Sequence, residues 1–89
     1  EVRFERVADQ LEQQLSQVIL RECRKALEPY PFEVKKVETK VDRMEDGSIY
    51  ISHIRVFLDK QQMGSRITVG KLLEQRLGRE VEVVAEDME

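Results

Sequence analysis

Few residues in this sequence are suited to disulfide, metal or redox chemistry, and the shortage excludes several classes of protein. The 89 residues include one cysteine and one histidine. Because Cys23 has no second cysteine to pair with, an internal disulfide is impossible. A metal site needs several converging ligands, and Cys23 and His53 are the only soft or borderline donors. We therefore expect no metal and no cofactor.

Long apolar runs are also missing. No stretch reaches the length of a membrane span, and no signal peptide is visible, so the sequence as given predicts a soluble chain. The chain begins at Glu1 without an initiator methionine, however. We expect residues 1–89 to form one domain, because this length leaves no room for a second. We also expect this domain to be excised from a longer, membrane-anchored protein.

Aromatic residues are scarce and charged residues are abundant. Aromatics make up 6% of the chain and charged residues 37%, so the core must be built mainly from Val, Ile and Leu. This composition suits a thin two-layer fold. The formal net charge of −3 repels phosphate, which argues against sequence-independent binding of nucleic acid.

A long amphipathic helix is predicted over residues 4–28. Its apolar residues recur at helical spacing and drift away from a strict heptad, as expected for a straight helix lying on a sheet. Pro29 and Pro31 end the helix. The apolar positions are Phe4, Val7, Ala8, Leu11, Leu15, Val18, Ile19, Cys23, Ala26 and Leu27.

Two alternating segments, 32–42 and 45–60, predict an antiparallel hairpin. The first changes phase between Val34 and Val37, which indicates a β-bulge near Lys35 and Lys36. Asp46-Gly47 is a tight-turn signal between the segments. In the second segment Ile49, Ile51 and Phe57 are predicted on one face, and the other face is predicted to carry Tyr50, Ile54, Val56 and Leu58.

The remaining third of the chain predicts a loop, a short helix and a third strand. Residues 59–68 are mostly polar, so a loop is predicted there. Residues 69–77 are predicted to form a helix, with Thr68 or Ser65 as N-cap and Gly78 after its C-terminus. The segment 79–87 then alternates as a strand.

The order α-β-β-α-β predicts an α+β fold, a two-layer sandwich with KH-like topology. Each helix has one apolar stripe, so both helices must cover the same face of the three-stranded sheet. The opposite face is left open. It is predicted to carry Lys36, Glu38, Lys40, Ile49, Ile51, His53, Arg55, Phe57, Glu80 and Glu82.

No catalytic constellation is predicted, so we expect the protein not to be an enzyme. Cys23 lies on the helix stripe and His53 on the open sheet face, with the sheet between them. The element order also favours an alternative, a KH-like nucleic-acid-binding domain. KH domains clamp nucleotides with a G-x-x-G loop, and this sequence contains none.

Four segments resemble the soluble C-terminal domain of the stage III sporulation protein AF family. They are "ADQLEQQL", "FEVKKVETKVD", "ISHIRVFLDK" and "LLEQRLGREVEVVAEDME", and the likeness covers essentially the whole chain. The segment from Asp59 to Val69 is short for that family, which leaves the second helix truncated or shifted.

The resemblance implies a ring-building motif, a module shared with ring-forming subunits of secretion systems. It implies an anchor in the mother-cell membrane of a spore-forming bacterium, with this domain between the mother-cell and forespore membranes. The implied partners are the other stage III A sporulation proteins and stage II sporulation protein Q, within a channel complex. A homo-oligomeric ring is expected in the tethered form, and a monomer for the isolated domain.

Ring building requires one surface of a subunit to meet a different surface of the next. We predict an interface patch of Ile49, Ile51 and Phe57 on the open sheet face, rimmed by Lys40 and Arg55. The neighbouring surface is predicted near Glu12, Gln13 and Lys71. The competing interpretation is that the stems of Lys36, Lys40 and Arg55 lie over these apolar groups.

Overall fold

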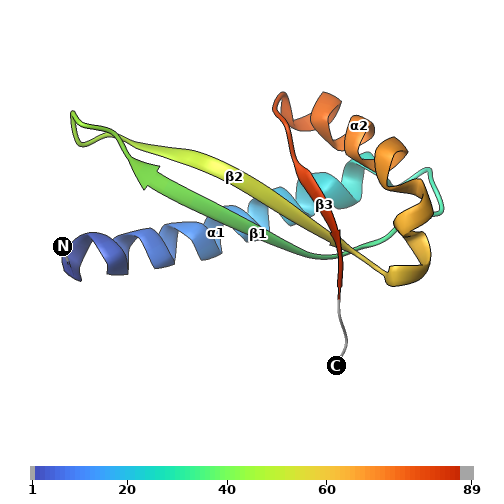
Figure 1. The fold of residues 1–89 in the computed structure, drawn as a ribbon, viewed down its shortest axis with the longest axis horizontal. Coiled ribbons are helices and arrows are strands. Elements are labelled where there is room, and N and C mark those ends of the chain that lie inside the picture. Colours follow the sequence, from blue (N-terminus) through green and yellow to red (C-terminus); the bar gives the residue numbers. More distant parts are fainter. Residues whose placement is uncertain (1, 87–89) are drawn as a thin grey trace.

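The computed structural model describes residues 2–86, with side chains from residue 6 onward, and confirms the α+β fold. Phe4 of the predicted stripe therefore lies outside the described side chains. Figure 1 shows a long helix and a hairpin of similar length, followed by a short helix and a short strand. The elements are α1 (Val2–Ala26), β1 (Val34–Arg43), β2 (Ile49–Leu58), the 3₁₀ helix η1 (Lys60–Ser65), α2 (Arg66–Leu77) and β3 (Glu82–Ala85).

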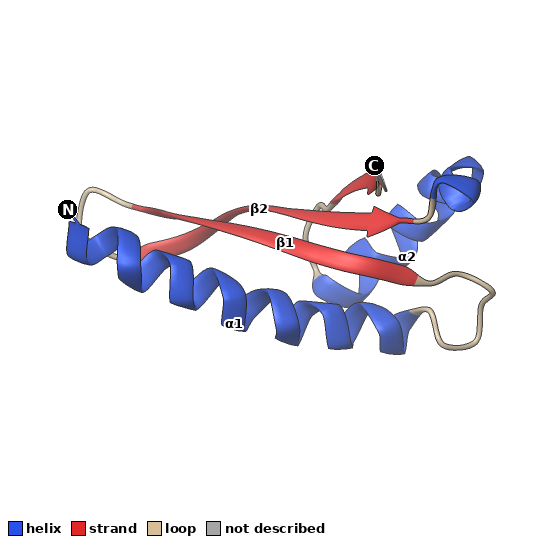
Figure 2. Ribbon diagram, turned by 90° about the horizontal axis from the view of Figure 1, so that it is seen from below, coloured by secondary structure: helices blue, strands red, loops and turns tan. Residues whose placement is uncertain are grey.

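Helix α1 runs along one face of the hairpin over almost its whole length (Figure 2). Ala8, Ile19 and Cys23 of the predicted stripe are buried. Val7 and Val18 are about half exposed, so the stripe is narrower than predicted. The helix ends at Ala26, two residues before the predicted end, and residues 27–31 form a turn that contains both prolines.

The hairpin forms at the predicted turn. Gly47 adopts φ +92°, a left-handed conformation that side chains disfavour, and its N–H donates to Met44 O at 3.0 Å. The Met44 N–H closes the ladder on Ser48 O at 2.8 Å. The bulge predicted near Lys35 is confirmed, because the register shifts between Val34 and Lys36.

A second bulge, which the alternation did not predict, changes the faces of β2. Lys40 pairs with His53 and Val41 pairs with Ile51, so Ser52 is an extra residue on β2. Ile51 consequently packs against the core, and Ile49, two residues away, shares its face. The prediction that both lie on the open face is wrong. By the same alternation Tyr50, predicted to point inward, belongs to the open face.

The connection after β2 is more regular than predicted. Residues 60–65 form a 3₁₀ helix rather than a loop, since the Asp59 carboxylate accepts the Gln61 N–H at 2.9 Å. Helix α2 then begins at Arg66, three residues before the predicted range 69–77, and its N-cap is Ser65, one of the two predicted N-caps. It ends at Gly78, whose φ of +74° closes the helix as predicted.

The sheet has the strand order β1-β2-β3, with β1 antiparallel and β3 parallel to β2. Because β3 pairs only with residues 55–58 of β2, the other half of the hairpin is a two-stranded extension (Figure 1). We call residues 39–53 the hairpin arm.

The core lies between the sheet and both helices. Side chains from α1 and α2 join one cluster with residues from a single face of the strands, so both helices cover the same face as predicted. The buried members are Ile19, Cys23, Leu27, Val34, Val37, Ile54, Val56, Leu58, Val69 and Leu73.

Candidate protein-docking surfaces

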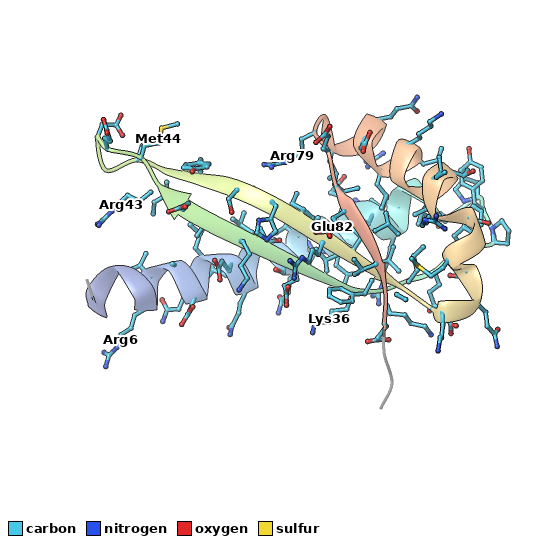
Figure 3. The ribbon with its side chains drawn as sticks, viewed as in Figure 1. Arg6, Lys36, Arg43, Met44, Arg79 and Glu82 are labelled. Carbon is cyan, nitrogen blue, oxygen red and sulfur yellow. The ribbon has the colours of Figure 1, made fainter. Side chains whose placement is uncertain are left out.

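The open face of the sheet is covered by its own polar network. Arg55 lies between glutamates on the two neighbouring strands, with its guanidinium 3.6 Å from Glu38 and 3.1 Å from Glu82 (Figure 3 labels Glu82). These three residues face one another across the sheet register. Each is partly exposed, so each pair adds little to stability, but together they keep Arg55 and its partners turned toward one another.

Phe57 lies beneath a cation rather than in an exposed apolar patch. Lys36 Nζ is 5.3 Å from the centre of the Phe57 ring, within the range of a cation–π interaction. Phe57 is half-buried, and Ile51 faces the core instead. The predicted patch of Ile49, Ile51 and Phe57 therefore does not come together. Of the competing interpretation, the structure shows one contact, that of the Lys36 ammonium with the Phe57 ring.

Glu12 has a different place from the one predicted. Its carboxylate accepts the Val41 N–H at 3.0 Å, and Ser16 Oγ accepts the Thr39 N–H at 3.1 Å. These N–H groups belong to the outer edge of β1, so α1 satisfies a sheet edge with its own side chains. Glu12 is thus engaged within the domain. The other predicted contact residues, Gln13, Lys40 and Lys71, are exposed.

Exposed apolar side chains gather at the end of the hairpin arm. Met44 is 53%, Ile49 39% and Tyr50 42% exposed. Figure 3 shows Met44 beside the turn, where the arm extends away from β3. Only Ile49 was predicted to be part of a docking surface. Met44 lies in the turn segment and Tyr50 was placed on the wrong face by the missed bulge.

A groove separates α2 from β3. It is shallow and open to solvent, with a volume of about 350 Å³, and both apolar and charged side chains line it. Ile67 stands at this groove and is 67% exposed. The sequence analysis did not predict this groove. It noted one of its residues, Lys71, as a contact residue, and another, Gly70, is unusual within a helix. The lining residues are Arg66, Ile67, Gly70, Lys71, Glu74, Val81 and Val83.

Cys23 and His53, the two side chains considered for catalysis or metal binding, lie apart. Cys23 is fully buried, and burial, followed by the charge of Glu22, raises the pKa of its thiol to about 11. Such a thiol is a poor nucleophile. His53 is on the open face, where Nδ1 lies 3.4 Å from Ser52 Oγ. Within residues 2–86, no group of His, Cys, Asp and Glu side chains could hold a metal ion.

A basic cluster occupies the C-terminal half of α1. Arg21, Arg24 and Lys25 line a shallow depression on the outer side of this helix. The depression involves α1 alone, so no second element shapes it.

No protein-family model, curated protein or solved structure matches the chain. The resemblance to the stage III sporulation protein AF family therefore stays a prediction. No helix in the described part of the chain is long and apolar enough to cross a bilayer.

Proposed function

We propose that this chain is a non-enzymatic protein-assembly module that binds partner proteins through the hairpin arm. The observation that carries the proposal is the grouping of Met44, Ile49 and Tyr50 at the end of the arm. Ile49 lies on the helix side of the arm and Tyr50 on its open side, so a partner that covers all three side chains must enclose the end of the arm.

The arm is built to present these side chains firmly. An isolated two-stranded hairpin is marginally stable, but α1 packs along this one and fixes its edge through Glu12 and Ser16. Full burial of a large apolar side chain contributes about 1.5–3 kcal/mol. Covering the part of Met44, Ile49 and Tyr50 that is still exposed would thus contribute roughly 1 kcal/mol each.

The resemblance described above supplies the context of the proposal. In that context the module contributes to a sporulation channel between mother cell and forespore. It would act beside the other stage III A proteins and stage II protein Q, with ring formation in the membrane-tethered form. Tethering raises the effective concentration of the module, so weak contacts through the arm would suffice for assembly.

Cysteine crosslinking in cells that produce the full-length protein tests the arm. Met44→Cys and Tyr50→Cys introduce reactive thiols there, and Val18→Cys on α1 is a control of similar exposure. Cys23 contributes little background because it is buried and its pKa is raised. We expect discrete crosslinked species from the two arm variants and not from Val18→Cys. Equal crosslinking from all three variants, or none from the arm, would refute the proposal.

The basic cluster on α1 favours a second candidate function, a KH-like nucleic-acid-binding domain. Arg21, Arg24 and Lys25 could contact phosphates. Titration with single-stranded RNA at two salt concentrations separates the candidates. A flat titration is expected for the assembly module, whereas salt-dependent binding lost in Arg21→Gln/Arg24→Gln would establish the alternative.

A further inference from the structure

The sheet has three stretches of strand edge, and side chains of the same chain form hydrogen bonds with backbone groups on two of them. The outer edge of β1 donates to Ser16 and Glu12. The edge of β2 within the arm is met by Arg79, whose Nη1 donates to Ile51 O at 3.1 Å (Figure 3). Proteins commonly protect strand edges with such polar side chains.

The outer edge of β3 has no such protection from residues 2–86. The Glu86 N–H donates to Leu58 O at 2.8 Å, toward β2. Because alternate residues of a strand direct their backbone groups to opposite sides, the N–H and C=O groups of Val83 and Ala85 point away from β2. No described residue hydrogen-bonds to these outward groups.

The groove between α2 and β3 runs beside this unprotected edge. Figure 1 shows α2 beside β3 on the side away from the hairpin arm. Ile67, Val81 and Val83 supply apolar surface, and Gly70 has no side chain to fill the space between them. Arg66 and Lys71 outnumber Glu74 on the helical wall, in a chain whose net charge is −3.

We infer that the β3 edge and the α2 groove together bind an extended segment of a partner protein as an added strand. The segment pairs its backbone with Val83 and Ala85. Its aliphatic side chains enter the groove against Ile67, and acidic residues lie near Arg66 and Lys71. This is the β-augmentation mode, in which backbone hydrogen bonds supply affinity and alternate side chains supply specificity. The inference concerns a surface other than the arm and does not depend on the arm's function.

A second copy of this chain is a poorer occupant. In a second copy, the N–H groups of Thr39 and Val41 on the β1 edge and the Ile51 carbonyl on the arm edge of β2 are already bonded within the chain, so β3 is its least protected edge. That strand has four residues, and pairing two of them would bury far less than the roughly 800 Å² per partner of a stable interface. A single flexible segment can instead contact the strand edge and the groove at once.

Two substitutions separate the contribution of backbone pairing to binding from that of side-chain contacts in the groove. Ala85→Pro removes an outward N–H without removing a bond to β2, and proline is tolerated at such edge positions. Ile67→Glu places a charge in the groove at an exposed helix position. Val18→Glu makes the same kind of change on α1, at a side chain that is 51% exposed, and serves as the control.

The experiment selects from a random twelve-residue peptide library displayed on phage, with the wild-type chain as bait. Dissociation constants of the selected synthetic peptides are then measured by fluorescence polarisation, and circular dichroism checks that each variant is folded. We expect peptides with alternating aliphatic residues and an acidic residue. Ala85→Pro and Ile67→Glu should each weaken their binding at least tenfold, and Val18→Glu less than twofold.

Three outcomes would overturn the inference. The first is the absence of any enriched peptide. The second is binding that survives Ile67→Glu or a folded Ala85→Pro variant. The third is self-association of the wild-type chain that these substitutions abolish, because the occupant would then be a second copy. None of these outcomes bears on crosslinking through Met44 or Tyr50, so the two proposals fail separately.

Discussion

Thr39 of β1 buries a hydroxyl group that has no hydrogen-bond partner within the described residues. The residue is 2% exposed and lies opposite Ile54. Its backbone N–H donates to Ser16 Oγ, but that bond does not involve the Thr39 hydroxyl. Burying an unpaired hydroxyl costs about 1–3 kcal/mol in protein mutational series. Thr39→Val replaces the hydroxyl with a methyl group of similar shape, so we expect the free energy of unfolding to rise by about 1–3 kcal/mol.

Urea denaturation followed by far-UV circular dichroism measures this change. If the slope of the unfolding free energy against urea concentration is unchanged, the substitution alters stability rather than the compactness of the unfolded state. In a thermal scan the midpoint should rise by about 4–8 °C per kcal/mol for a domain of this size.

Two further variants make the result interpretable. Thr68→Val makes the same chemical change at an exposed position of α2, where we expect an effect within about 0.5 kcal/mol. Thr39→Ser keeps the hydroxyl and removes a buried methyl group, so it should destabilise by about 1 kcal/mol. A destabilising Thr39→Val beside a neutral Thr68→Val would refute the reasoning and show that the hydroxyl is paired, for example with a buried water.

Three further outcomes are expected. Gly70→Ala should stabilise the domain by about 0.5–1 kcal/mol in urea denaturation, because glycine is unfavourable within a helix. The new Cβ would lie 3.6 Å from the Val83 methyl carbon, an ordinary contact, so a loss of stability would contradict the geometry. For Cys23 the folded-state pKa of about 11 exceeds the ordinary 9.0, so the thiol's contribution is complete below pH 9 and is lost as the pH rises toward 11. The difference between a pKa of 9.0 and one of about 11 corresponds to about 3 kcal/mol of unfolding free energy. If stability falls equally with pH in Cys23→Ala and in the wild type, this contribution of the thiol is disproved. Finally, Arg76 Nη2 lies 2.9 Å from Glu22 Oε1. A double-mutant cycle with Glu22→Gln and Arg76→Gln should give a coupling of about 0.2–1 kcal/mol that falls at high salt, and a coupling indifferent to salt would not fit an exposed ion pair.

Much of the fold could be predicted because its signals are local. The Asp46-Gly47 turn requires a left-handed glycine, and Gly78 ends α2 for the same reason. The long helix was predicted from the spacing of its apolar residues. The 3₁₀ helix was missed because a single carboxylate, that of Asp59, starts it without any periodic pattern.

The candidate site was predicted less well, because its composition depends on pairing between distant residues. The Ser52 bulge moved Ile49 and Ile51 to the helix side, and Tyr50 took the place predicted for them on the open face. Nothing in the sequence near Ser52 indicates this, since a bulge exists only relative to the register of a partner strand.

The sequence by itself determined the helices, the turn and the order of the elements, because each depends on interactions within a few residues. Only the tertiary structure decided which surfaces stay available. The Glu12 carboxylate meets a strand 29 residues away, and Arg79 reaches a carbonyl 28 residues away. Such contacts depend on how α1 and β3 lie against the hairpin. They leave the apolar side chains at the end of the arm exposed, and no residue in the described part of the chain bonds the outward backbone groups of Val83 and Ala85.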